Sequence, residues 1–294
     1  MKIAARLAAV LALGVGSSGC FAVDMLVKVK GDGSGTVEKT ITMNPQALQE
    51  MKSEMESAGF KDTGDSKKKG TKEKSPADLT DKELLDGPFD PEELKKEAAK
   101  MGTGVTFVSA TPVRQPDKMG VKAVFAFKDI NQLKLSQKPL PDNGPGGGKK
   151  ASPEDDLKFS LAKKGGNSVL TLKAKPMDLK PGAGKPKASP APEGMEKMAE
   201  GMLEMMKPML KGLRITIGVE VDGTVVKTNS AYAAGNRVTY MDLDFGALLA
   251  DQKALKAFGE EMEGSVAQQK AAFAKIKGMK VHLDPEMVVE FKAN

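Results

Sequence analysis

The feature that most constrains the fold of this chain is an alternation of apolar and polar residues over short stretches that end at Gly-rich turns. The clearest example is Leu213 to Val221, in which every second residue is Leu, Ile or Val and the residues between them are polar or small. Side chains alternate between the two faces of a β-strand, so this pattern predicts a strand with one buried face and one solvated face. A chain rich in such stretches is expected to fold mainly into sheets.

Many of these stretches come in pairs that a short turn connects, which is typical of antiparallel hairpins. The turns are rich in Gly, Asp and Asn, the residues that tight turns favour. The pairs are residues 23–29 with 37–43, 105–107 with 121–127, and 157–161 with 170–172.

Two further predictions concern the carboxy-terminal part of the chain. Asp222-Gly223 is a strong hairpin turn, so the strand that ends before it is expected to continue into a return strand at Val225-Val226. Residues 279–283 and 287–291 are expected to be edge strands, because a proline separates them.

Helix start signals lie between these stretches. Asn44-Pro45 places an N-cap residue before a proline at the first helical position, where the missing N–H has no helical partner anyway. Asp90-Pro91-Glu92-Glu93 resembles a capping box, so a short helix is expected to begin there. A long helical pattern follows Gly246. The expected fold class is therefore α+β, with an antiparallel sheet of hairpins and helices packed on one face of it.

Three stretches rich in Gly, Pro, Lys and Ser interrupt these patterns, at residues 61–76, 140–153 and 180–192. They carry no apolar periodicity and cannot bury enough surface to offset the entropy lost on ordering. We expect them to be flexible inserts in one domain that spans residues 20–294.

The amino terminus has the layout of a secretory signal peptide. Lys2 and Arg6 precede an apolar run at residues 7–15, which is too short to cross a membrane as a helix. Small residues then lead to Cys20, the only Cys in the chain. The tetrad Ser-Ser-Gly-Cys at residues 17–20 resembles the lipobox of bacterial lipoproteins, with Ser where that family usually has Leu.

The lipobox resemblance implies that residues 1–19 are removed and that Cys20 is acylated, so the mature chain is anchored to a membrane. Stable anchoring needs more than one acyl chain, and this modification adds several. Phe21 stands where Asp would favour retention in the inner membrane, so we expect the outer membrane of a bacterial envelope, with the chain facing the periplasm. The alternative is an ordinary signal peptide followed by a free thiol.

The rest of the composition excludes several function classes. One Cys and one His cannot form a disulfide or a Cys/His zinc cluster, and a catalytic triad would depend on His282 alone. The net charge of +6 comes almost wholly from Lys, and aromatic residues make up 4% of the chain. This composition supplies few base-reading Arg and few stacking side chains, so we expect no nucleic acid partner. We also expect no enzymatic activity, no cofactor and no metal.

A Met-rich helical pattern lies between the last insert and Leu213, and most of its Met residues share one helix face. They are Met195, Met198, Met202, Met205 and Met209. Such a stripe can line an adaptable apolar groove for an amphiphile. Packing in the core and Cu(I) binding by thioethers are the alternatives.

Two other candidates have less support. Asp242 and Asp244 lie two apart on one expected strand, so their carboxylates share a face that would suit acid-base chemistry or a divalent cation. We expect them instead on a solvent-facing strand edge. His282 is expected to be a solvated strand residue without a second ligand nearby.

Two blocks of the sequence resemble LppM-like bacterial lipoproteins. The first, CFAVDMLVKVKGDGSGTVEKTITM from Cys20, is an acylatable Cys followed directly by an alternating strand and a Gly-rich turn. The second, residues 221–229 and 235–240, is a Gly-Val strand that runs into Thr-Asn, followed by a short loop and a Val-Thr-Tyr strand. The resemblance implies an envelope lipoprotein that handles lipid or glycolipid, and it carries over no catalytic residue.

Two functions are consistent with these patterns. The first is a non-enzymatic, lipid-anchored binding module for a lipid, glycolipid or other amphiphile. The second is a structural or accessory subunit that binds another envelope protein. A deep apolar cavity favours the first function, and a flat exposed apolar patch of more than a few hundred Å² favours the second.

Replacement of the only Cys tests the predicted anchor. Cys20→Ser removes the thiol that carries the acyl chains, so the precursor should remain unprocessed and should lack the lipid. Metabolic labelling with a fatty acid and mass spectrometry of the protein check both effects. A variant that is matured and fractionates like the wild type contradicts the lipoprotein assignment.

Overall fold

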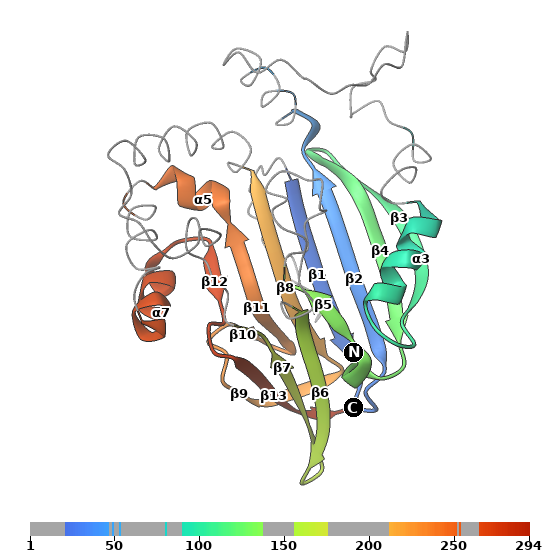
Figure 1. Ribbon diagram of the computed structural model, residues 1–294. Coiled ribbons are helices and arrows are strands. Elements are labelled where there is room, and N and C mark those ends of the chain that lie inside the picture. Colours follow the sequence, from blue (N-terminus) through green and yellow to red (C-terminus); the bar gives the residue numbers. More distant parts are fainter. Residues whose placement is uncertain are drawn as a thin grey trace, which may run out of the picture.

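The computed structural model describes residues 21–46, 49, 53, 80, 90–137, 156–175, 212–251, 253 and 265–294. Most of these residues form two β-sheets (Figure 1). The predicted signal peptide, Cys20, the five Met residues of the predicted stripe and the three predicted inserts lie outside the described residues.

The first sheet has eight strands, of which seven lie in the order β10-β11-β8-β1-β2-β4-β3, and β12 pairs with β11. The strands are β1 (Phe21–Val29), β2 (Gly35–Met43), β3 (Thr106–Gln115), β4 (Lys118–Phe127), β8 (Leu213–Val221), β10 (Ala233–Ala234), β11 (Arg237–Asp244) and β12 (Met279–Val281). β1 therefore lies in the middle of this sheet, with a partner strand on each of its edges.

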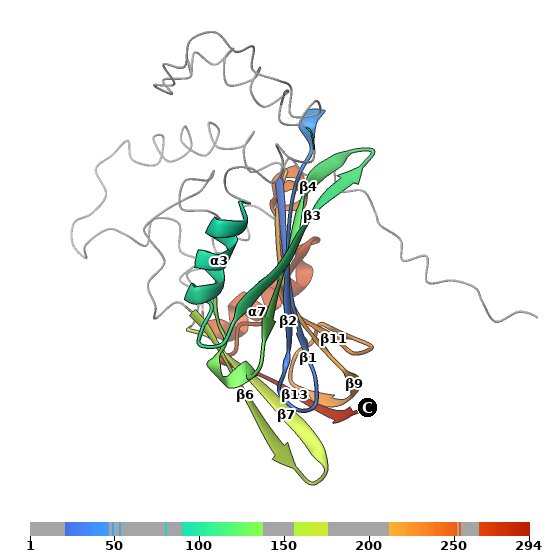
Figure 2. The same cartoon turned by 90° about the vertical axis from the view of Figure 1, so that its right-hand side faces the viewer.

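The second sheet has five strands in the order β5-β6-β7-β13-β9, and every pair in it is antiparallel. The strands are β5 (Lys134–Ser136), β6 (Asp156–Lys164), β7 (Asn167–Lys173), β9 (Gly223–Thr228) and β13 (Glu286–Ala293). Figures 1 and 2 show this sheet crossing one face of the first sheet, at the end opposite to helix α5 (Phe245–Ala250).

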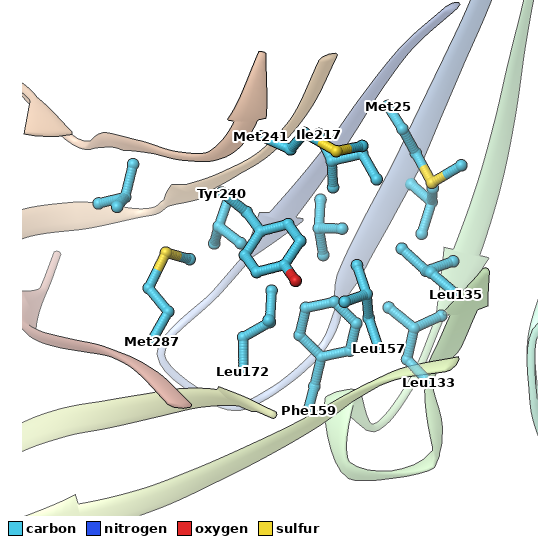
Figure 3. Packing of buried hydrophobic residues seen from close by; sticks show 14 of the residues in the cluster. Met25, Leu133, Leu135, Leu157, Phe159, Leu172, Ile217, Tyr240, Met241 and Met287 are labelled. Atoms are coloured by element: carbon cyan, nitrogen blue, oxygen red, sulfur yellow. The ribbon is translucent and has the colours of Figure 1, made fainter. Parts of the chain in front are cut away.

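The two sheets share one hydrophobic core (Figure 3). Alternate residues of the first sheet face it, and among them Val27 and Ile217 are completely buried. The second sheet contributes Phe159 and Leu172, and the ring of Tyr240 from β11 lies between the sheets. Burial of one large apolar side chain contributes about 1.5–3 kcal/mol, so the contact between the sheets is a major source of stability.

The structures that the sequence predicts from local signals are present. β1 with β2, β3 with β4, and β6 with β7 are antiparallel neighbours connected by short turns. Helix α3 (Pro91–Lys100) begins at Asp90, whose carboxylate accepts a hydrogen bond from the backbone N–H of Glu92 at 2.8 Å. Helix α7 (Val266–Lys275) begins at Ser265 in a capping box with Gln268, a start that was not predicted from the sequence.

The prediction of helices packed on one face is not confirmed. α3 contacts β3, α5 contacts β8 and α7 contacts β12, so the described helices border different strands. The short 3-10 helix η2 (Ile130–Gln132) contacts β6 of the second sheet. The second sheet, which the sequence did not separate from the first, covers part of the face where we expected helices (Figure 2).

One strand pair contradicts the prediction of an antiparallel sheet. β1 and β8 are parallel and in register, from Phe21 opposite Leu213 to Val29 opposite Val221. The two strands are far apart in the sequence, so no tight turn imposes an antiparallel direction on them. The first sheet is therefore mixed.

The hairpin predicted at Asp222-Gly223 is wrong. β8 stays in the first sheet between β1 and β11, whereas β9 pairs with β13 in the second sheet. Both edges of β8 are occupied, so the chain has to leave the first sheet at this point. Gly223 allows the passage, because its φ is +155° and a Cβ there would lie 2.1 Å from the carbonyl oxygen of Lys292.

The last strand is also not the edge strand that we predicted. β13 lies between β7 and β9 and pairs with both. Pro285 precedes the strand, so its missing N–H does not interrupt the ladder. Its carbonyl oxygen accepts a hydrogen bond from the backbone N–H of Ala174 at 3.0 Å.

A matched pair of glycine variants tests the passage between the sheets. Gly223→Ala places a methyl group against the Lys292 carbonyl and should lower the free energy of unfolding by about 1–3 kcal/mol, the usual cost of backbone strain. Gly235→Ala is the control, because Gly235 also has a positive φ of +62° but has no such neighbour within 4 Å of its Cβ position. Urea denaturation should show a larger loss of unfolding free energy for Gly223→Ala than for Gly235→Ala. Equal losses would contradict the close contact between position 223 and the Lys292 carbonyl.

Candidate functional site

A hollow of about 690 Å³ lies on the outer face of the first sheet, the face turned away from the core. Residues of β1, β8 and β11 form its floor, and the first residues of α5 border it. Its polar lining includes Asp24, Lys118, Arg214, Thr216, Arg237 and Asp242.

Strand register brings side chains from three strands together in this hollow. Asp24 of β1 lies opposite Thr216 of β8, which lies opposite Asp242 of β11. The register of β11 shifts at a bulge around Tyr240, so the alternation of its side chains changes by one residue there. Arg237 before the bulge and Asp242 after it therefore both lie on the outer face.

Arg214 and Asp242 form a bidentate ion pair at one wall of the hollow. Nε and Nη2 of Arg214 donate to the two carboxylate oxygens at 2.9 and 3.0 Å. The hydroxyl of Thr216 donates to the same carboxylate at 3.4 Å. Asp242 is only 8% exposed. A bidentate pair of this kind fixes both side chains in one geometry, so it forms a rigid wall of the site.

The prediction that Asp242 lies on a solvent-facing strand edge is therefore wrong. Asp242 is buried because β11 lies inside the sheet, between β8 on one edge and β10 and β12 on the other. Asp244 accepts a hydrogen bond from the backbone N–H of Ala247 at 2.9 Å and caps α5. Each carboxylate has its own structural partner, so the two do not act as a pair.

Asp24 and Arg237 are a pair of opposite charges in the hollow with binding capacity to spare. Nη2 of Arg237 lies 3.6 Å from Oδ2 of Asp24, and the two side chains are 39% and 45% exposed, respectively. This distance is too long for a hydrogen bond, so the pair is held by charge alone. The side chain of Arg237 crosses Gly218 of β8, where a Cβ would lie in ordinary van der Waals contact with Nε at 3.5 Å.

The surroundings of Asp24 disfavour its charge. Partial burial in the floor of the hollow raises the pKa of Asp24 above its ordinary value, and this effect outweighs the opposing positive charges of Arg237 and Arg214. The negative charges of Asp242 and Glu38 raise the pKa further. A carboxyl with a perturbed pKa in a hollow of the surface is typical of a functional site.

His282 is buried, contrary to the prediction of a solvated residue. It is 6% exposed, and Nε2 lies 3.0 Å from the carbonyl oxygen of Glu286. Its backbone N–H donates to the carbonyl oxygen of Tyr240 at 2.8 Å. These contacts fix the segment between β12 and β13. Within the described ranges, no group of three or more His, Cys, Asp or Glu residues is arranged to hold a metal ion.

A second hollow, of about 370 Å³, lies on the outer face of the second sheet and includes Lys164, Lys227 and Glu290. The carboxylate of Glu290 is already bonded there, since it accepts a hydrogen bond from Asn167 at 2.6 Å. The large apolar side chains exposed among the described residues are Val108, Val226 and Val266, on β3, β9 and α7. Neither hollow is a deep apolar cavity, and these valines lie on separate elements (Figure 1).

Reasoning from the sequence did not single out Asp24 or Arg237. The one local signal is the charge of Asp24 inside the otherwise apolar stretch FAVDMLV. A charge in a strand pattern usually indicates a solvated face, and only the pairing of β1 with β8 and β11 with β8 shows what lies beside it.

No protein-family model matches the sequence, and no curated protein matches it. The structure is similar to the folded domain of the LppM protein of Mycobacterium tuberculosis, which was determined by NMR. The two share 11% sequence identity at a TM-score of 0.30, over 94% of this chain and 91% of that chain. A likeness at this level carries no conclusion about function. Among the described residues, no helix is long and apolar enough to cross a membrane.

The raised pKa of Asp24 predicts how stability depends on pH. A carboxyl whose pKa is higher in the folded state stabilises the fold fully below its unfolded value, near 3.8, and loses this contribution as the pH rises through the folded pKa. Asp24→Asn stays neutral, so at neutral pH it should melt at the same or a higher temperature than the wild type. Calorimetry should show the difference shrinking as the pH falls towards 3.8. A lower melting temperature at neutral pH would contradict the assignment.

Proposed function

We propose that this protein is a non-enzymatic binding module of the bacterial envelope that is anchored through acylated Cys20. In this proposal, the hollow on the outer face of the first sheet binds the polar head of a lipid, glycolipid or other amphiphile. Phe21, which follows the predicted anchor, supports the outer membrane as its site, with the chain facing the periplasm.

The position of the hollow carries this proposal. β1 begins at Phe21, whose backbone N–H donates to the carbonyl oxygen of Gly212 at 3.0 Å. Consecutive Cα atoms are about 3.8 Å apart, so the predicted acylation site is one residue away from a strand in the centre of the sheet. Ala22, two residues after Cys20, already lines the hollow. An anchored chain therefore holds the hollow at the membrane surface without a flexible linker.

The chemistry of the lining supports a polar head rather than an acyl chain. Arg237 and Lys118 offer N–H donors, Asp24 offers acceptors, and the hydroxyl of Thr239 can do either. Large apolar side chains do not dominate the lining, as they would in a pocket for an acyl chain. The acyl chains of the bound amphiphile would stay in the bilayer while the protein binds the head at its surface.

Native mass spectrometry of the acylated protein, extracted from membranes in a mild detergent, tests this proposal. The wild type should retain an amphiphile in addition to its own acyl chains. Arg237→Gln should reduce the retained fraction about tenfold or more, the usual effect of losing a charged hydrogen bond. Lys227→Gln is the control, because it removes a cation from the second hollow, and it should retain the amphiphile like the wild type.

One result would replace the proposed function by the second one. If the wild type retains no amphiphile and instead copurifies with one envelope protein in a fixed ratio, the chain acts as an accessory subunit. The same Arg237→Gln variant then separates the two functions, because an accessory subunit that docks elsewhere would keep its partner.

A further inference from the structure

We propose that the hollow recognises a phosphoethanolamine head, in which Asp24 binds the primary ammonium and Arg237 binds the phosphate. This inference rests on the proposed function and names its ligand class. The two side chains face each other at 3.6 Å without a hydrogen bond between them. A ligand that carries a cation and an anion two carbons apart can exchange this weak pair for two charged hydrogen-bonded pairs.

The charge balance of the lining favours a zwitterion. The lining contains three cations, Lys118, Arg214 and Arg237, and three carboxylates, Asp24, Asp242 and Asp244. Arg214 forms a bidentate pair with Asp242, and the carboxylate of Asp244 caps α5. The lining therefore carries equal numbers of positive and negative charges, and its weakly held pair of Asp24 and Arg237 suits a ligand with one ammonium and one phosphate.

The cation is expected to be a primary ammonium rather than a quaternary one. A quaternary ammonium has no N–H to donate and is recognised by the faces of aromatic rings. No aromatic side chain lines this hollow among the described residues. The carboxylate of Asp24 instead offers oxygens that accept N–H hydrogen bonds, and a primary ammonium supplies three such donors.

The anion is expected to be a phosphate that comes together with the ammonium. The planar guanidinium of Arg237 can bind two phosphate oxygens at once, and Lys118 adds a second positive charge to the same lining. A head with only negative charge would place that charge beside Asp24, and like charges at close range disfavour binding. The pair of Asp24 and Arg237 therefore selects against purely anionic and purely cationic heads.

Three soluble probes test the ligand class on the full acylated protein in an uncharged detergent. They are glycerophosphoethanolamine, glycerophosphocholine and glycerophosphoglycerol, which share the phosphate and differ in the group attached to it. Titration calorimetry should give an affinity for the ethanolamine probe about tenfold or more above that for the other two, as expected for one additional charged hydrogen-bonded pair.

Single substitutions assign the two halves of the head. Asp24→Asn should abolish the preference for the ethanolamine probe and leave the three affinities equal, whereas Arg237→Gln should weaken all three about tenfold or more. Asp284→Asn is the matched control for Asp24→Asn, because Asp284 is a surface carboxylate bonded to Lys270 at 2.6 Å outside the hollow. The control should keep the preference of the wild type.

Vesicles identify the source of the head. Protein reconstituted in phosphatidylcholine vesicles should bind the ethanolamine probe, and protein in vesicles that contain phosphatidylethanolamine should not, because the lipid head already occupies the site. If the ethanolamine probe binds to the protein in both kinds of vesicle, the hollow recognises the same phosphoethanolamine group on a free molecule rather than on a membrane lipid. Two results would overturn this inference and leave the proposed function intact. In the first, the wild type binds all three probes with equal affinity; in the second, it binds none of the probes but still retains an amphiphile. Loss of both the probes and the amphiphile overturns both.

Discussion

β1 is held along both edges, by β2 through a hairpin and by β8 through a parallel pairing that covers all nine residues of the strand. The pairing of β1 with β8 connects two groups of strands in the first sheet: β1, β2, β3 and β4 on one side, and β8 with the strands that follow it on the other. No local turn connects β1 with β8. Without this pairing the first sheet would divide between β1 and β8, and the core that both halves share with the second sheet would be open to water. The backbone hydrogen bonds of a central strand are also the ones that a sheet loses last.

The same pairing determines where the candidate site lies. Because β1 starts beside the start of β8, the residue that follows the predicted anchor is already part of the sheet. The bulge in β11 then shapes the hollow, because it turns Arg237 and Asp242 to the same face. A β11 strand without the bulge would turn Asp242 to the opposite face and away from the hollow.

Features that depend on residues close together in the sequence were predicted correctly, and features that depend on distant residues were not. The hairpins of β1 with β2, β3 with β4 and β6 with β7, and the start of α3 at Asp90, depend on residues within a few positions of one another, and all were predicted. The Asp222-Gly223 hairpin failed because the strand before it already has two partners from distant parts of the chain. The solvated states expected for Asp242 and His282 failed for a related reason, since strands distant in the sequence cover both. Asp24 and Arg237 were missed because each lies in an ordinary strand pattern.

The sequence by itself determined the strands, the three hairpins of neighbouring strands, the start of α3 and the layout of the amino terminus, because these depend on side-chain size, backbone freedom and charge within a few neighbouring residues. It also determined that the chain lacks the Cys and His residues for a disulfide or a zinc cluster. Only the tertiary structure decided that the strands form two sheets, that β1 and β8 run parallel, and that Asp24, Arg214, Arg237 and Asp242 share one hollow. These features depend on which strand edges pair and in which register. An alternating pattern specifies which face of a strand is buried, but many partners and registers satisfy it equally well.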